Sequence, residues 1–99
     1  MLLIVGTFRL PADAVVTAKG AMEAMMTASR AEDGCFEYGY AEDVLEAGLF
    51  HVTERWRDRA ALDAHFQTRH MAEWRAAGQA LGLADRALSL YVADEGEAL

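Results

Sequence analysis

The first segment of the chain, residues 2–8, is apolar at nearly every position rather than at every second one. Residues 2–5 read Leu-Leu-Ile-Val, and Phe8 ends the run. A strand covered on one face alternates between apolar and polar residues, whereas a strand covered on both faces is apolar throughout. The segment therefore predicts a strand in a sheet that has a covering layer on each side.

The remaining pattern predicts helices and strands in succession. In chain order they are a helix that follows Pro11 and ends near Ala31, strands over residues 35–40 and 49–56, a short helix capped by Asp58, a helix between Thr68 and Gly82, and a strand over residues 86–93. A chain of 99 residues suits one domain, which we place at residues 1–93. Residues 94–99 are expected to form an acidic, frayed tail.

The order β-α-β-β-α-α-β is that of two split βαβ units on one antiparallel sheet. It predicts an α+β fold, a ferredoxin-like sandwich with every helix on one face of the sheet. Because the first and last strands carry apolar residues on both faces, a single helical layer would leave one apolar face in water. We therefore expect two copies of the chain to pair through the open sheet face as a homodimer.

The alternation within the strand at residues 35–40 assigns its side chains to faces. Phe36, Tyr38 and Tyr40 should share one face, and Cys35 should lie on the other. A small cysteine at the start of such a strand is most simply a packing residue.

Net charge and cysteine content restrict the partners and the compartment. Nine basic and sixteen acidic residues give a net charge of −7, which disfavours nucleic acid and anionic membrane surfaces as partners. No apolar run approaches the roughly 18–20 residues of a membrane span, and the N-terminus does not resemble a signal peptide. The single cysteine cannot form an internal disulfide, so we expect a cytoplasmic protein.

Several catalytic classes lack their motifs. The chain has no Cys-x-x-Cys or His-x-x-x-His pair, and His65 and His70 would lie on different faces of a continuous helix. No metal site is therefore expected. Neither Gly-x-Ser-x-Gly nor Gly-x-Gly-x-x-Gly occurs, which argues against a covalent hydrolase and a nucleotide enzyme.

His65 is the strongest candidate for a functional side chain. It follows Leu62 by three positions and precedes Phe66, so it should face the sheet rather than water. One interpretation is a core histidine that is hydrogen-bonded to a carbonyl. The other is a base, a proton donor or a ligand-orienting group in a cavity, because histidine as a residue type changes charge near neutral pH.

Charged residues near this histidine need partners of their own. Glu54 shares a strand face with Trp56, and a buried carboxylate requires a partner. An arginine such as Arg75 or Arg86 could supply it. The stretch 55–75 holds five arginines and three acidic residues. Such a stretch is usually a solvated face, and it also suits an anionic ligand.

Two motifs resemble the antibiotic biosynthesis monooxygenase family. Residues 32–38, Glu-Asp-Gly-Cys-Phe-Glu-Tyr, are similar to the family's helix-to-strand junction, Glu-x-Gly-Cys followed by a tyrosine. Residues 54–58 and 61–65, with Thr68 and His70 after them, are similar to its Glu-x-Trp-x-Asp and Ala-Leu-x-x-His stretch. The resemblance extends from the first strand to the last.

The resemblance implies a dimeric α+β barrel with a cavity in each subunit. Family members include monooxygenases that oxidise polycyclic phenols or quinols with O2 without a cofactor, haem-degrading enzymes, and an isomerase of a phosphorylated signal. The haem-degrading members use an asparagine, a tryptophan and a histidine at positions that here hold Phe8, His65 and Arg75. The asparagine, tryptophan and arginine of the polyketide-type members cannot all be present, since the chain has no asparagine. The quinol-oxidising type resembles this chain best, through Glu54, Trp56 and His65.

We therefore predict a cofactor-independent monooxygenase that acts on an aromatic phenol or quinol with O2 and requires no metal. His65 would be the base or proton shuttle, and Glu54 would position it. The expected substrate-binding residues are Trp56, Trp74, Phe66, Tyr38, Phe8 and Met22. Two alternatives remain: a non-catalytic module that binds a small ligand in the same cavity, and an isomerase that needs an acid–base pair but no O2.

Overall fold

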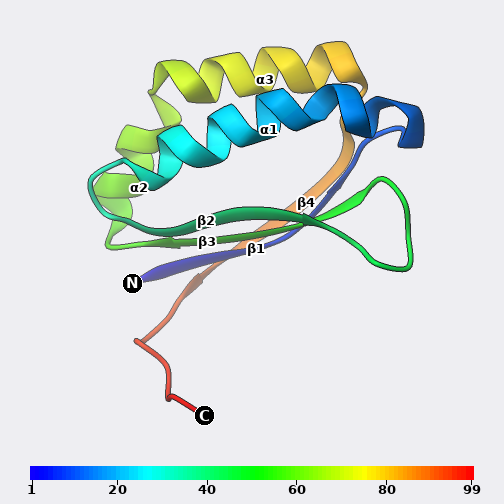
Figure 1. The fold of residues 1–99 in the computed structure, drawn as a ribbon. Helices are drawn as coiled ribbons and strands as arrows, with labels where there is room; N and C mark the ends of the chain where they lie inside the picture. The colour runs from blue at the N-terminus through cyan, green and yellow to red at the C-terminus, as the bar shows by residue number, and fades with distance from the viewer.

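A computed structural model describes residues 1–99 as one antiparallel sheet under a layer of helices (Figure 1). The elements are β1 (Leu2–Arg9), a 3₁₀ turn η1 (Ala12–Ala14), α1 (Val15–Arg30), β2 (Cys35–Glu42), β3 (Leu49–Trp56), α2 (Arg59–Phe66), α3 (Arg69–Leu81) and β4 (Ala84–Val92). The strand order in the sheet is β2-β3-β1-β4. This arrangement confirms the α+β, ferredoxin-like sandwich. None of the helices combines the length and the apolar character needed to cross a membrane.

The helix ends lie where the capping residues predict them. The Asp58 carboxylate accepts a hydrogen bond from the Ala61 N–H at 2.9 Å, and the Thr68 hydroxyl accepts one from the Met71 N–H at 3.2 Å. Gly82 ends α3 in the left-handed region with φ of 83°. The first helix differs from expectation, because the turn after Pro11 is 3₁₀ and the α-helix begins only at Val15.

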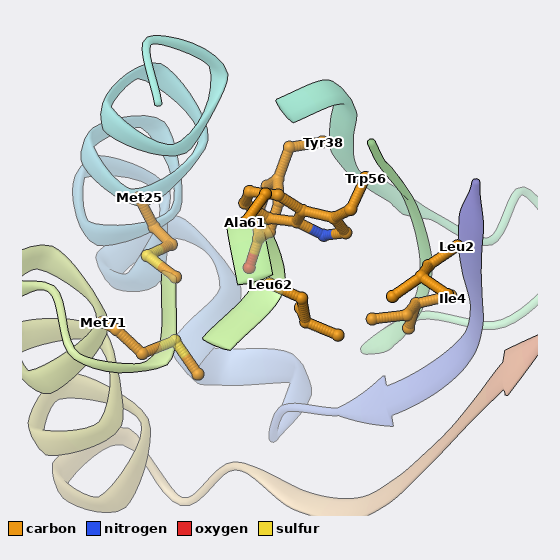
Figure 2. Close-up of a cluster of buried hydrophobic side chains, with 8 residues drawn as sticks. All are labelled: Leu2, Ile4, Met25, Tyr38, Trp56, Ala61, Leu62 and Met71. Carbon is orange, nitrogen blue, oxygen red and sulfur yellow. The ribbon is translucent and has the colours of Figure 1, made fainter. Parts of the chain in front are cut away.

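Two buried clusters fill the space between the sheet and the helices. The first contains Trp56, and in it Leu62 of α2 points toward Ile4 of β1 (Figure 2). The second contains Phe8, Phe50 and neighbouring apolar side chains near the other end of the sheet. Strand β3 contributes to both clusters through its inward face, as the period of two predicts.

Strand β2 departs from strict alternation at its start. Cys35 pairs with Trp56 while Glu37 pairs with Arg55, so one extra residue is inserted in β2. As a result Cys35 packs against the core, and Phe36 is 54% exposed. The prediction that Phe36 shares one face of the strand with Tyr38 and Tyr40 is wrong, because the bulge shifts the faces by one position.

The face of the sheet opposite the helices is uncovered (Figure 1). Strand β4 forms one edge of the sheet and pairs only with β1. At its end Tyr91 is 53% and Val92 is 85% exposed, although they point to opposite faces. Beyond Val92 the chain has no helix or strand and leads away from the sheet (Figure 1).

We predict that the protein is a homodimer that pairs through this uncovered face of the sheet. Light scattering should return twice the chain mass of 10.8 kDa. A dimer interface that is stable in solution typically buries more than ~1,000 Å². Tyr91→Lys should shift the equilibrium toward the single chain. Tyr91 pairs with Leu3 and so lies on the sheet face opposite the core residues Leu2 and Ile4, where a lysine places a charge in the expected interface. A stable species of one chain mass at micromolar concentration would contradict the prediction.

Candidate active site

A cavity of about 820 Å³ lies between the helices and the sheet. Helix α1 packs on β2, and α3 packs mainly against α1, so α3 leaves space above the β1–β4 half of the sheet. Residues from all four strands and from α2 and α3 line this space, and 12 of its 21 lining residues are hydrophobic. Its size and lining are typical of sites for small organic ligands.

His65 is held in the wall of this cavity by a carboxylate. Its side chain is 1% exposed, and its Nδ1 lies 2.6 Å from Oε2 of Glu32. Its ring centroid is 4.6 Å from that of Trp56 and 5.4 Å from that of Tyr38. The ring is therefore fixed by one hydrogen bond and by aromatic contacts.

The pairing with Glu32 determines which nitrogen of His65 is available for chemistry. An ionised carboxylate only accepts hydrogen bonds, so Nδ1 of His65 must carry the hydrogen. In the neutral ring the lone pair is then on Nε2, which has no hydrogen-bond partner within the chain. The one fully buried side-chain nitrogen or oxygen that lacks a hydrogen bond is Nε of Arg55. Nε2 of His65 is therefore not fully buried and retains access to the cavity that His65 lines.

A second histidine shares the same carboxylate oxygen. Nε2 of His70 lies 2.8 Å from Oε2 of Glu32. On a continuous helix His65 and His70 would face different ways, but α2 ends at Phe66 and α3 starts at Arg69. The break redirects the chain so that both rings meet Glu32.

The cluster of Glu32, His65 and His70 has the composition of a metal site. Its ligand atoms all lie within 4.8 Å of one another. However, the carboxylate oxygen is 2.6 and 2.8 Å from the two ring nitrogens, whereas two ligands of one tetrahedral zinc ion are about 3.3 Å apart. These distances are those of hydrogen bonds, so the arrangement is that of a carboxylate that orients two imidazoles.

Glu54 is the second carboxyl group in the cavity wall. Burial raises its pKa, although the Trp56 Nε1–H donates a hydrogen bond to Oε1 at 3.0 Å. The arginine partner suggested for Glu54 is not found, since neither Arg75 nor Arg86 forms an ion pair with the Glu54 carboxyl group. Trp56 stands two positions along the same strand face, which places its indole beside the carboxyl group.

Aromatic side chains form much of the remaining wall. The rings of Tyr40 and Trp74 are stacked with their centroids 5.2 Å apart, and Phe8 contacts Trp74 edge-on with a centroid distance of 5.9 Å. The hydroxyls of Tyr38 and Tyr40 are hydrogen-bonded at 2.7 Å. Burial raises the pKa of both phenols, so each keeps its proton at neutral pH.

Comparison with known proteins decides the family. The family model for antibiotic biosynthesis monooxygenases matches residues 1–77. The chain belongs to this family. It is 36% identical over 73 residues to "Putative monooxygenase Rv0793" of Mycobacterium tuberculosis, a match that covers 74% of this chain and 71% of that protein. An uncharacterized protein of Synechocystis is 50% identical over 46 residues, but the match spans only 31% of that protein.

Solved structures of the family share the whole fold. A "putative antibiotic biosynthesis monooxygenase" from Deinococcus radiodurans superposes with a TM-score of 0.91 and 26% identity over 100% of this chain and 98% of that one. The structure of Rv0793 gives a TM-score of 0.76 with 32% identity over 99% and 98% of the two chains. The family assignment therefore agrees with both the sequence and the architecture, and a general monooxygenase-like function follows from it.

In this member of the monooxygenase family, most of the expected site residues line one cavity. They are Phe8, Tyr38, Glu54, His65, Phe66 and Trp74. Trp56 and Met22 are not part of the cavity surface. Trp56 is completely buried behind His65, and Met22 belongs to the second core cluster.

Sequence reasoning did not assign a role to several groups that the structure places at the site. Glu32 and His70 orient or extend the His65 network, and Tyr40 joins the aromatic wall. Glu32 and His70 lie within the two family motifs, which was the available signal. The contact of Glu32 with His65 could not be predicted from sequence spacing, because the two residues are 33 positions apart.

The only cysteine should be unreactive at neutral pH. Burial, with the nearby charges of Glu32 and Glu54, raises the pKa of Cys35 from 9.0 to about 11. Since the thiolate is the reactive form, iodoacetamide at pH 8 should label the folded protein ~10²-fold more slowly than the urea-unfolded chain. The folded rate should then rise as pH approaches 11. Equal rates for the two states at pH 8 would contradict this prediction.

Proposed function

We propose that the protein is a cofactor-independent monooxygenase that oxidises an aromatic phenol or quinol with O2. The observation that carries the proposal is the free Nε2 of His65 at the wall of an aromatic cavity, with Glu32 holding Nδ1 at 2.6 Å. This is the geometry of an oriented general base. A hydroxyl of the substrate that reaches Nε2 can transfer its proton there, and Glu32 stabilises the imidazolium that results.

Proton removal is the step that the protein has to supply in this chemistry. A phenolate or quinolate donates an electron to O2 far more readily than the neutral molecule does. For a hydroquinone the overall reaction balances as substrate plus O2 giving a hydroxyquinone plus water. One oxygen atom enters the ring, the other is reduced to water, and the substrate provides all four electrons.

The other residues of the cavity would position the substrate and exclude water. The aromatic wall formed by Phe8, Tyr40 and Trp74 presents ring faces and edges to a planar ligand. The raised pKa of Glu54 favours its protonated form more than that of an exposed glutamate. Glu54 would therefore serve as a hydrogen-bond donor to a substrate oxygen as well as an acceptor.

The test is an O2-uptake screen of quinols and hydroxyanthrones, run in air and under argon with added catalase. Autoxidation produces H2O2, from which catalase returns half of the O2, whereas monooxygenation consumes one O2 for each substrate and returns none. With ¹⁸O2, the product should contain one labelled oxygen atom. His65→Gln, prepared in parallel, provides the matched control for uncatalysed oxidation.

The same screen separates the alternatives. Turnover under argon would identify an isomerase, because that reaction needs an acid–base pair and no oxidant. Binding without O2 uptake above the control rate would identify a non-catalytic ligand-binding module. Either result would overturn the monooxygenase proposal.

Haem should not be degraded by this protein. The three positions that matter in the haem-degrading members hold Phe8, His65 and Arg75 here, and all three line the cavity. After incubation with haem, a reductant and catalase, the Soret band should persist. Ordered loss of the band with formation of a defined tetrapyrrole product would contradict the prediction.

A further inference from the structure

The charge of the cavity wall is opposite to that of the whole chain. The protein carries a net charge of −7, yet the lining contains three arginines, Arg59, Arg75 and Arg86, and one carboxyl group, that of Glu54. An excess of positive charge in one concave site of an acidic protein attracts an anionic ligand there and not elsewhere.

Two of these arginines lack a partner within the chain. Arg59 is paired with Asp63 at 3.1 Å. Arg75 and Arg86 form no ion pair and no hydrogen bond, whereas most of the other basic side chains do. Those with a partner are Arg9, Arg30, Arg55, Arg57, Arg59 and Arg69. Lys19 is the one further unpaired cation, and it lies outside the cavity on α1. The unpaired positive charge of the chain is thus concentrated at this site.

The Arg86 guanidinium acts on the polar groups of the cavity. Its charge lowers the pKa of Glu54, Tyr38 and Tyr40, in each case against the larger effect of burial. Arg86 comes from β4 and Arg75 from α3, the two elements that border the cavity on opposite sides. A group bound between them would meet one guanidinium from the sheet and one from the helix layer.

A guanidinium matches a carboxylate in both charge and shape. Its planar fork of N–H donors forms paired hydrogen bonds with the two carboxylate oxygens. The adjoining wall of Tyr40 and Trp74 rings suits a flat aromatic body. His65 lies in the same cavity, so an aromatic hydroxyl and a carboxylate on one ligand have separate places to bind.

We propose that the cavity selects aromatic hydroxy compounds that carry a carboxylate, with Arg75 and Arg86 binding the carboxylate. This inference rests on the proposed function only in taking the cavity as the substrate site, and it names the substrate class. The inference concerns the binding of the ligand, which does not require O2.

The experiment compares two ligands that differ only in the carboxylate. Calorimetric titration under argon uses 6-hydroxy-2-naphthoate, whose hydroxyl and carboxylate lie at opposite ends of the ring system, and 2-naphthol with the wild type, Arg75→Gln and Arg86→Gln. The wild type should bind the naphthoate at least ~10-fold more tightly than the naphthol, since hydrogen bonds to charged groups are among the stronger ones. Each substitution should remove most of that preference and leave naphthol binding unchanged.

Arg69→Gln is the matched control. Arg69 also lies on α3, but it is paired with Glu73 and does not line the cavity. Its replacement should leave both affinities unchanged. Because both target arginines are exposed, thermal melts of all variants should stay close to that of the wild type. Raising the ionic strength should weaken naphthoate binding and not naphthol binding.

Each outcome has a distinct meaning. Equal affinity for the two ligands, a preference that survives both substitutions, or no binding of either ligand would overturn this inference. Turnover of neutral quinols without a carboxylate preference would overturn it and leave the monooxygenase function intact. Selective naphthoate binding with no O2 uptake would retain the inference and remove the proposed function.

Discussion

Replacing His65 by glutamine is expected to lower the turnover of a confirmed substrate by at least ~10²-fold, the usual contribution of a general base. Glutamine keeps a side-chain N–H that can donate to Glu32, but it has no basic nitrogen to face the cavity. Because the donor to Glu32 is retained, the melting temperature should fall by only a few degrees. Rate and thermal melt are measured on one preparation.

Two further variants show whether the base acts through its carboxylate. Glu32→Gln should also lower turnover, since the neutral amide stabilises the imidazolium less well than a carboxylate does. His70→Ala removes the other hydrogen-bond partner of Glu32 and leaves the His65 ring in place, so its effect on turnover should be much smaller. A His65→Gln protein with a much lower melting temperature but the wild-type turnover rate per folded molecule would show that the role of His65 is purely structural.

Gly6→Ala is expected to be strongly destabilising, although it adds only one methyl group. A Cβ at Gly6 would lie 2.0 Å from the carbonyl oxygen of Ala87 and 2.7 Å from Cα of Leu88. Both are backbone atoms, so β4 would have to move away from β1. We expect a loss of about 3 kcal/mol of the free energy of unfolding, the upper range for overpacked sites.

Gly20→Ala is the matched control with the opposite expected sign. Gly20 is exposed on α1, and a Cβ there would meet nothing within 4 Å. Alanine should therefore stabilise the protein by about 0.5–1 kcal/mol through helix propensity. Urea unfolding of both variants measures the two changes. A neutral Gly6→Ala substitution would contradict the close approach of β1 and β4.

The fold could be predicted because its determinants are local. The side chains of Asp58 and Thr68 cap helices whose first turns follow directly in the sequence, and Gly82 ends the last helix. The bulge at the start of β2 could not be predicted in this way. Its extra residue exists only relative to the pairing of Cys35 with Trp56 on another strand.

The candidate site was predictable in part for the same reason. The position of His65 relative to Leu62 places it on the inward face of α2, and burial confirms that orientation. Its partner Glu32 follows α1, so their contact depends on how two helices end near one another. The partner of Glu54 was nearer than expected, because the indole two positions along the strand competes with any distant arginine.

The connection between α2 and α3 consists of two residues, and both are helix caps. Gln67 is the C-cap of one helix and Thr68 is the N-cap of the next. One inserted residue here would rotate the start of α3 by about 100° in helical phase and carry the His70 ring away from Glu32, while the two helices could still form. Among chains of this fold, the length of this connection is therefore a more informative character than the identity of its residues, and it can be counted directly in an aligned sequence.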